Sequence, residues 1–134
     1  MSEQSGSSLT GVWQGVYAYP QGDSVPFLAT LIESGPFVTG STQESCAAGP
    51  GLRISATALI DGTRGGSRVE FRKTYDGSAG WDHMVSYDGA INPDGSEIEG
   101  AWRLSDGTHG RFLMRRERRK AKEVEVRKLT DVEA

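Results

Sequence analysis

The segment "RVEFRKTYDGSAGWDHMVSYDG", residues 68–89, indicates the fold most directly. Apolar and polar residues alternate through residue 75, stop at a Gly-rich connector, and alternate again from residue 83. In a strand, side chains two residues apart share a face. One face of the first run therefore consists of Val69, Phe71, Lys73 and Tyr75. Two such runs joined by turn residues predict a pair of antiparallel strands, with a lysine on the apolar face.

The same alternation recurs along most of the chain. The eight runs are residues 9–19, 25–34, 37–44, 52–61, 67–75, 83–92, 97–104 and 108–116. Short connectors rich in Gly, Asp and Ser separate them, whereas a parallel crossover needs about a dozen residues or more. The sequence therefore predicts an all-β fold, a single eight-stranded antiparallel up-and-down β-barrel, because closure removes exposed strand edges. A sandwich of two sheets is the alternative.

The chain divides into three parts. Residues 1–8 are rich in Ser, Gly and Gln, a composition that predicts a disordered leader. Residues 9–116 form the predicted barrel domain. Residues 117–134 form a charged C-terminal tail, in which a short helix and a further strand both fit the pattern.

Composition excludes several classes of function. No run approaches the roughly 20 apolar residues of a membrane span, and the N-terminus lacks the features of a secretory signal. One cysteine, Cys46, cannot form an internal disulfide, so we expect a cytoplasmic protein. The basic tail lacks the interleaved aromatics of a nucleic-acid site. It follows an acidic body, and this split predicts either self-association into a homo-oligomer or a partner for the tail.

The predicted inner face carries more polar groups than a dry core usually keeps. These groups are Tyr17, Tyr19, Thr42, Glu44, Lys73 and Tyr87. Each unpaired buried polar group costs about 1–3 kcal/mol, and apolar walls with a few polar groups are typical of a small-molecule site. Lys73 has three possible roles: a buried partner for Glu44, a contact for an anionic ligand group, or a rim residue with its ammonium in water.

The glycines on the inner face have two interpretations. They lie at positions 11, 15, 40, 89 and 100. They could make room for Trp13 and Trp102 to lie against the opposite wall, or they could leave volume for a guest. An eight-stranded barrel can either be filled by side chains or hold one small ligand.

The stretch Gly11-Val12-Trp13, at the start of eight strands, resembles the opening of the calycin barrels, the lipocalins and avidins. In those barrels the Trp closes one end under a basic residue from the last strand, a role that the resemblance gives to Arg115 or Arg116. The resemblance to avidins extends over residues 9–114 through "VTGSTQES", "RVEFRKTY", "VSYDG" and "IEGAWRLSDG". It implies ligand contacts from Phe71, Tyr87 and Trp102.

Departures from the avidin pattern fall on the residues that contact biotin. Gly15 and Tyr19 stand where the first avidin strand presents Asn and, nearby, Ser, while Thr42 replaces a Tyr and Val85 a Thr. The last strand has no Asp in the corresponding segment. We therefore expect a ligand other than biotin. The candidate site consists of Tyr17, Tyr19, Thr42, Glu44, Phe71, Lys73, Val85, Tyr87 and Trp102.

No catalytic constellation accompanies this site. Cys46 falls in a predicted flexible loop, and no signature ties His83 or His109 to it. Two histidines without ligand spacing do not predict a metal site, and nothing predicts a cofactor. The expected function is non-catalytic binding of a small hydrophobic or anionic ligand. The alternative is a filled structural barrel that oligomerises or docks a protein partner.

Overall fold

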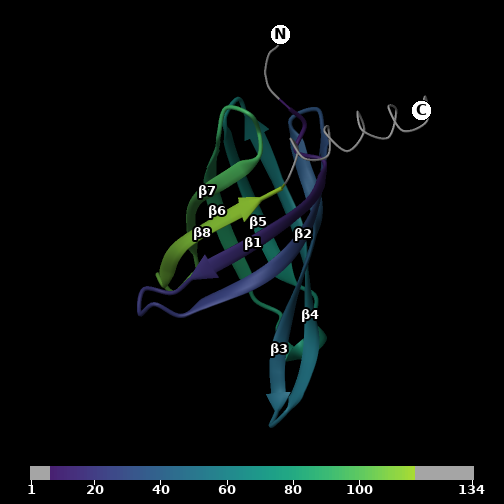
Figure 1. The fold of residues 1–134 in the computed structure, drawn as a ribbon, viewed down its shortest axis with the longest axis vertical. Helices are drawn as coiled ribbons and strands as arrows, with labels where there is room; N and C mark the ends of the chain where they lie inside the picture. The colour runs from purple at the N-terminus through teal and green to yellow at the C-terminus, as the bar shows by residue number, and fades with distance from the viewer. Residues whose placement is uncertain (1–6, 117–134) are drawn as a thin grey trace, which may run out of the picture.

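The computed structural model describes residues 7–116, which form a closed barrel of eight antiparallel strands in sequence order (Figure 1). The strands are β1 (Gly11–Ala18), β2 (Ser24–Ser34), β3 (Phe37–Gly49), β4 (Leu52–Gly65), β5 (Arg68–Tyr75), β6 (Met84–Ile91), β7 (Glu97–Arg103) and β8 (His109–Arg115). β1 pairs with β8 as well as with β2, and this pairing closes the sheet. The up-and-down barrel is confirmed, and the two-sheet sandwich is excluded.

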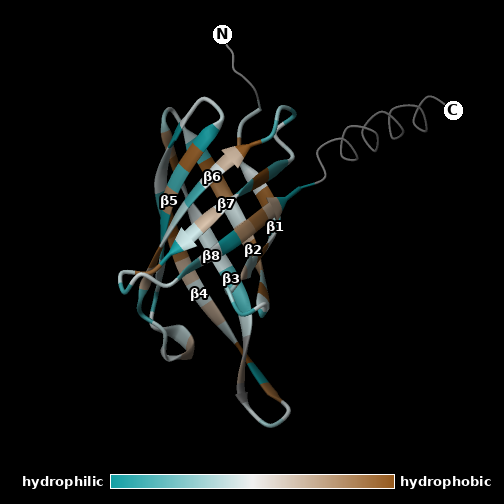
Figure 2. Cartoon of the chain, turned by 90° about the vertical axis from the view of Figure 1, so that its left-hand side faces the viewer, coloured by the Kyte–Doolittle hydropathy of each residue, from teal (hydrophilic) through white to brown (hydrophobic). Residues whose placement is uncertain are grey.

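Alternation along each strand separates the core from the surface, as the bands of hydrophobic and hydrophilic residues show (Figure 2). Along β5 every second residue is buried, from Val69 to Tyr75, while the residues between them are exposed. The same period continues around the barrel and places large apolar side chains inside. A single core therefore fills the barrel, with Thr42, Glu44 and Lys73 as its buried polar and charged members.

The β3–β4 hairpin is longer than the sequence indicates and projects beyond the rest of the barrel (Figure 1). Cys46 lies opposite Ile54 in this hairpin, so its predicted place in a flexible loop is wrong. The small residues around Cys46 obscure the alternation there. Arg53 stabilises the extension, because its guanidinium donates to the Ser45 Oγ and to the Ser45 carbonyl, both at 3.0 Å.

Two of the inner glycines lie directly against aromatic rings. A Cβ at Gly15 would lie 2.2 Å from Cζ of Phe27, and one at Gly89 would lie 2.8 Å from Cζ of Phe112. Gly100 serves a different purpose, since a Cβ there would lie 1.9 Å from the carbonyl oxygen of Asp88 on the neighbouring strand. At Gly15 and Gly89 the space is therefore occupied by rings, which are those of phenylalanines instead of tryptophans.

Residues 1–6 of the predicted leader and the predicted tail, 117–134, lie outside the described residues. Between residues 7 and 116, no helix has the length and apolar character needed to cross a membrane. A 3₁₀ turn, Ser78–Gly80, interrupts the connection between β5 and β6.

Candidate functional site

A tryptophan and an arginine seal the end of the barrel where β1 begins, called here the Trp13 end. Trp13 is fully buried, and its Nε1 donates to the Leu9 carbonyl at 2.9 Å. The Arg116 guanidinium lies 4.4 Å from the Trp13 ring centroid, a cation–π contact. Of the two arginines that the calycin resemblance allows in this role, Arg116 occupies it. Arg115 points outward and pairs with Glu97 at 3.2 Å.

The segment before β1 crosses the same end. Leu9 is fully buried, and its backbone N–H donates to Glu33 Oε1 at 2.8 Å. Arg64 Nη1 lies 2.9 Å from that oxygen and also donates to the Ser7 carbonyl at 2.8 Å. These contacts hold the segment against the barrel, so the Trp13 end is closed.

The opposite half of the barrel, called the Glu44 end, is organised around one buried carboxylate. Tyr17 donates its hydroxyl to Glu44 Oε2 at 2.6 Å, and Tyr75 donates to Oε1 at 2.7 Å. Lys73 Nζ lies 3.4 Å from Oε1. Strands β1, β3 and β5 thus supply a buried cluster in which one carboxylate accepts from two phenols and one ammonium.

Aromatic rings surround the ammonium of Lys73. Its Nζ lies 4.5 Å from the ring centroid of Tyr17, 5.1 Å from Phe27, 5.0 Å from Tyr75 and 5.3 Å from Tyr87. The residue is 1% exposed, so the predicted rim position does not occur and the predicted pairing with Glu44 does. Among the described residues, Glu44 is its one hydrogen-bond acceptor, at a long distance. The ring faces supply the remaining stabilisation of the charge.

Burial dominates the protonation equilibria of this cluster. Burial lowers the pKa of Lys73 to about 8, while the nearby Glu44 carboxylate acts in the opposite direction. Burial and the hydrogen bond to Glu44 raise the pKa of Tyr17 and Tyr75 well above the ordinary value. Burial does the same for Tyr87. The tyrosines therefore stay neutral over the range in which Lys73 exchanges its proton.

Thr42 adds an unsatisfied polar group to the same half of the barrel. It is 1% exposed, and its Oγ1 has no hydrogen-bond partner. Its neighbours across the two adjacent strands are Ala29 and Ala58, both fully buried and small. An unsatisfied buried hydroxyl costs about 1–3 kcal/mol. Thr42 therefore offers hydrogen-bonding capacity that the described residues leave unused.

Three aromatic rings pack together beside this cluster, each near the middle of its strand. Phe71 stacks on Tyr87 with centroids 4.9 Å apart, and Phe112 meets Tyr87 edge-on at 4.9 Å. Trp102 lies 5.1 Å from Tyr19 in an edge contact, and its Nε1 donates to a backbone carbonyl of β1. Phe71, Tyr87 and Phe112 therefore pack on one another, whereas Trp102 and Tyr19 lie where β1 ends, at the Glu44 end.

The predicted site residues fall into two groups. Tyr17, Glu44 and Lys73 meet in the polar cluster, whereas Phe71 stacks on Tyr87 and Trp102 contacts Tyr17 edge-on. The others lie around them: Thr42 is buried nearby on β3, Val85 pairs opposite Lys73, and Tyr19 is half-buried beside Trp102.

Two residues that contact Lys73, Tyr75 and Phe27, were not among the predicted site residues. Both belong to the predicted inner face, and both contact Lys73. Tyr75 follows Lys73 by two residues on β5 and therefore lies on the same face. That spacing could have identified Tyr75, whereas Phe27 reaches Lys73 from across the barrel and left no local signal.

The β5–β6 connection packs beside Tyr75. Trp81 meets the Tyr75 ring edge-on at 5.1 Å, and His83 lies 4.7 Å from the same ring. Ser78 Oγ accepts from the Thr57 backbone N–H at 2.8 Å, which ties the connection to β4. These contacts place aromatic groups over the Glu44 end, next to the polar cluster.

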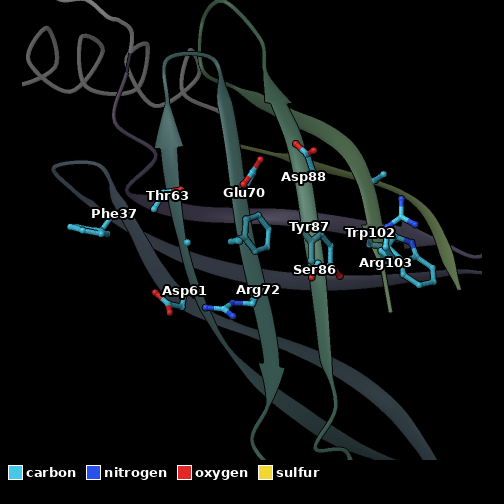
Figure 3. Close-up of a pocket in the computed structure, with 13 residues that line it drawn as sticks. Phe37, Asp61, Thr63, Glu70, Arg72, Ser86, Tyr87, Asp88, Trp102 and Arg103 are labelled. Atoms are coloured by element: carbon cyan, nitrogen blue, oxygen red, sulfur yellow. The ribbon is translucent and has the colours of Figure 1, made fainter. Parts of the chain in front are cut away.

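A surface depression of about 590 Å³ lies on the outside of β4 to β7 (Figure 3). Its charged side chains are exposed, and Asp61 and Arg72 stand side by side on neighbouring strands. Glu70 and Asp88 share the same outer face. Exposed, mixed charges in water contribute little to binding a small molecule. The buried cluster on the inner side of the sheet is therefore the better candidate site.

Within residues 7–116, no group of three or more His, Cys, Asp or Glu residues is arranged to hold a metal ion. The two histidines, His83 and His109, lie on different connections or strands and are both exposed.

The architecture recurs in designed proteins. A redesigned β-barrel matches this chain with a TM-score of 0.68 at 14% identity, over 81% of this chain and 91% of that one. A fluorescence-activating β-barrel designed de novo matches with a TM-score of 0.55 at 14% identity, over 81% and 93%. No family model and no curated protein matches the chain. At this identity the likeness shows the fold alone.

We expect Glu44→Gln to lower the free energy of unfolding by about 3–5 kcal/mol, because the change keeps the shape but leaves the Lys73 ammonium without a counter-charge. Urea denaturation followed by tryptophan fluorescence measures the loss. The double variant Glu44→Gln/Lys73→Met should recover part of it. A single variant as stable as the wild type would show that the pair is not buried as described.

We expect the stability to rise between pH 8 and about pH 10 and to fall above it. Lys73 has a folded pKa near 8, so its unfolded form binds more protons over the first interval. Tyr17, Tyr75 and Tyr87 ionise near pH 10 when unfolded but not when folded, so stability is lost above that pH. Urea midpoints across this range measure the curve. Lys73→Met should remove the rise and keep the fall.

Proposed function

We propose that this protein is a non-catalytic binder of a small molecule, held at the Glu44 end of the barrel. The observation that carries the proposal is the hydrogen-bonding capacity left unused there. The Thr42 hydroxyl has no partner, and the Lys73 ammonium has one distant acceptor among the described residues. A ligand with a hydrogen-bond acceptor would satisfy both groups and offset the cost of burying them.

The two ends of the barrel differ in a way that favours entry at the Glu44 end. At the Trp13 end, Trp13 and Leu9 have no exposed surface and are tied together by a hydrogen bond. The closed end is also held by the Arg116 and Arg64 contacts. In this proposal a guest therefore reaches Lys73 from the Glu44 end.

The surroundings of Lys73 indicate the chemistry of the ligand. Four aromatic rings and the small side chains of Ala29 and Ala58 favour a flat, mostly apolar body. The ammonium favours an anionic or carbonyl group at one end of that body. One of the similar designed barrels is fluorescence-activating, which supports the idea that a barrel of this shape can hold a small molecule.

A calycin-type ancestry, closest to the avidins, is part of this proposal. The contact between Arg116 and Trp13 is the arrangement that the resemblance implies for the closed end. The residues of the Glu44 end differ from the avidin pattern at Gly15, Thr42 and Val85. The proposed ligand is therefore a molecule other than biotin.

We expect 8-anilinonaphthalene-1-sulfonate, an apolar anion, to bind the full chain with saturable 1:1 fluorescence enhancement. Lys73→Met should weaken its binding by about tenfold or more, since a hydrogen bond to a charged group contributes about 1.5–3 kcal/mol. Arg72→Met is the matched control, because the adjacent side chain points outward and should leave the affinity unchanged.

Equal affinities of wild type and Lys73→Met would place the probe elsewhere and overturn the assignment of the site. Circular dichroism on both variants confirms that they fold. Native mass spectrometry of untagged protein adds an independent readout, since a retained molecule would give a mass excess that disappears on denaturation.

A second candidate function, self-association, is favoured by the uncharged outer face of β1 to β3 and the middle of β4. The outward side chains there carry no ionisable group: Val12, Gln14, Val16, Leu28, Thr30, Ile32, Thr39, Ser41, Gln43, Thr57 and Leu59. On β4 this face is bounded by the exposed charges of Arg53 and Asp61. Val12, Ile32 and Leu59 are each more than half exposed. The outer face of β5 to β8 is instead covered with charged residues, including the exposed pair Arg68–Asp88.

The occupant that fits this neutral face is a second copy of the chain. Residues 1–114 carry thirteen Asp and Glu against seven Lys and Arg, so two copies repel through most of their surfaces. The neutral face avoids this repulsion. It also places the apolar side chains of Leu28 and Ile32 against their equivalents in a two-fold pairing.

We expect the full chain to sediment as a dimer and Ile32→Glu to sediment as a monomer, because the substitution places like charges across the two-fold interface. Ser86→Glu is the control, since it adds the same charge between Arg72 and Arg103 on the charged face. A monomeric wild type, or a dimer that survives Ile32→Glu, would show that this face does not pair.

A further inference from the structure

Lys73 differs from every other basic residue of the barrel in its chemistry. It is the one lysine among residues 1–119, and the other basic residues of the strands and their connections are arginines and the two exposed histidines, His83 and His109. An arginine would supply a permanent counter-charge for Glu44, but its guanidinium does not lose a proton in proteins. A lysine can lose its proton and then carries a nucleophilic lone pair. The buried position is thus occupied by the basic side chain that can react.

The environment of the Lys73 Nζ atom favours the neutral amine, which is the nucleophilic form. The ammonium lies among four ring faces and is 1% exposed, so water does not stabilise its charge. Its pKa falls to about 8, so about a tenth of the amine is neutral at pH 7. The tail lysines at 120, 122 and 128 belong to a different, highly charged sequence context.

We propose that Lys73 binds an aldehyde or ketone ligand covalently, as a Schiff base, with Glu44 as the proton carrier and counter-ion. The inference rests on the proposed function, because the carbonyl compound must reach the same end of the barrel. It narrows the ligand class to a mostly apolar molecule with one carbonyl group. The geometry that carries it is the Nζ to Glu44 Oε1 distance of 3.4 Å inside the ring cage.

The reaction balances without a further reagent. Glu44 accepts a proton from the ammonium, and the nitrogen lone pair forms a bond to the carbonyl carbon while the C=O π bond breaks. One of the two remaining N–H protons moves to the carbonyl oxygen, which becomes a hydroxyl. Return of the proton releases that hydroxyl as water and leaves a protonated imine. In sum, one aldehyde and one ammonium give one iminium and one water, with the positive charge conserved.

The two tyrosines hold the proton carrier in place. Tyr17 and Tyr75 donate to both oxygens of Glu44, at 2.6 and 2.7 Å, and so fix the carboxylate beside Nζ. After the reaction the same carboxylate faces the iminium. An iminium–carboxylate ion pair thus takes the place of the ammonium–carboxylate ion pair. The buried charge balance is unchanged, so the adduct leaves no unpaired charge in the core.

The test uses 2-naphthaldehyde with sodium cyanoborohydride on the full chain, followed by peptide mass mapping. We expect Lys73 to be alkylated at least tenfold faster at pH 7 than Lys120, Lys122 or Lys128, which serve as internal references. Lys73→Arg keeps a cation beside Glu44 and should retain labelling of the tail lysines alone. This variant keeps the test decisive even if Lys73→Met unfolds.

The alcohol analogue, 2-naphthalenemethanol, separates the two proposals. If it protects the barrel from urea while Lys73 is alkylated no faster than the tail lysines, ligand binding stands and the Schiff base is overturned. If neither the alcohol nor the anilinonaphthalene probe binds, the binding site itself is absent and both proposals fail.

Discussion

The Glu44 carboxylate is the constraint on which the interior depends. A buried charge must be paired and hydrogen-bonded, and this one accepts from Tyr17, Lys73 and Tyr75 on two other strands. Each of those donors in turn has its position fixed. If a tyrosine ring left the core, its hydrogen bond to Glu44 would be lost. If the ammonium moved toward water, its contacts with the ring faces would be lost. One carboxylate therefore orders three strands at the Glu44 end.

The asymmetry of the barrel follows from this arrangement. The Trp13 end needs no internal charge, because a fully buried tryptophan and a covering guanidinium seal it from outside. The Glu44 end keeps its polar groups inside, together with an unsatisfied threonine hydroxyl. The rings of Phe71, Tyr87 and Phe112 pack together near the middle of their strands. The Trp13 end is thus a closed structural end, whereas the Glu44 end buries more polar groups than its packing needs. The proposed ligand site lies at the Glu44 end.

Much of this could be predicted because a strand has a period of two. The inward position of Lys73 follows from its spacing to Phe71 and Tyr75, and the eight runs with short connectors suffice for the barrel. Boundaries were harder to predict. Small residues around Cys46 hide the continuation of β3, and nothing local shows that Arg53 holds the extended hairpin together. The set of rings around the Lys73 ammonium could not be predicted from local sequence, because Phe27 and Lys73 belong to strands that are not neighbours.

By itself, the sequence determined the all-β class, the inner and outer faces, and the residues that could line a site, since alternation and turn chemistry are local properties. Tertiary structure alone decided what the inner groups do. In the folded barrel, Lys73 pairs with Glu44 in the interior and does not lie at the rim. Arg116, and not Arg115, covers the Trp13 ring. Phenylalanine rings occupy the space beside Gly15 and Gly89. These outcomes depend on the registers between strands and on distances across the barrel, which are set when the sheet closes and all eight strands take their places.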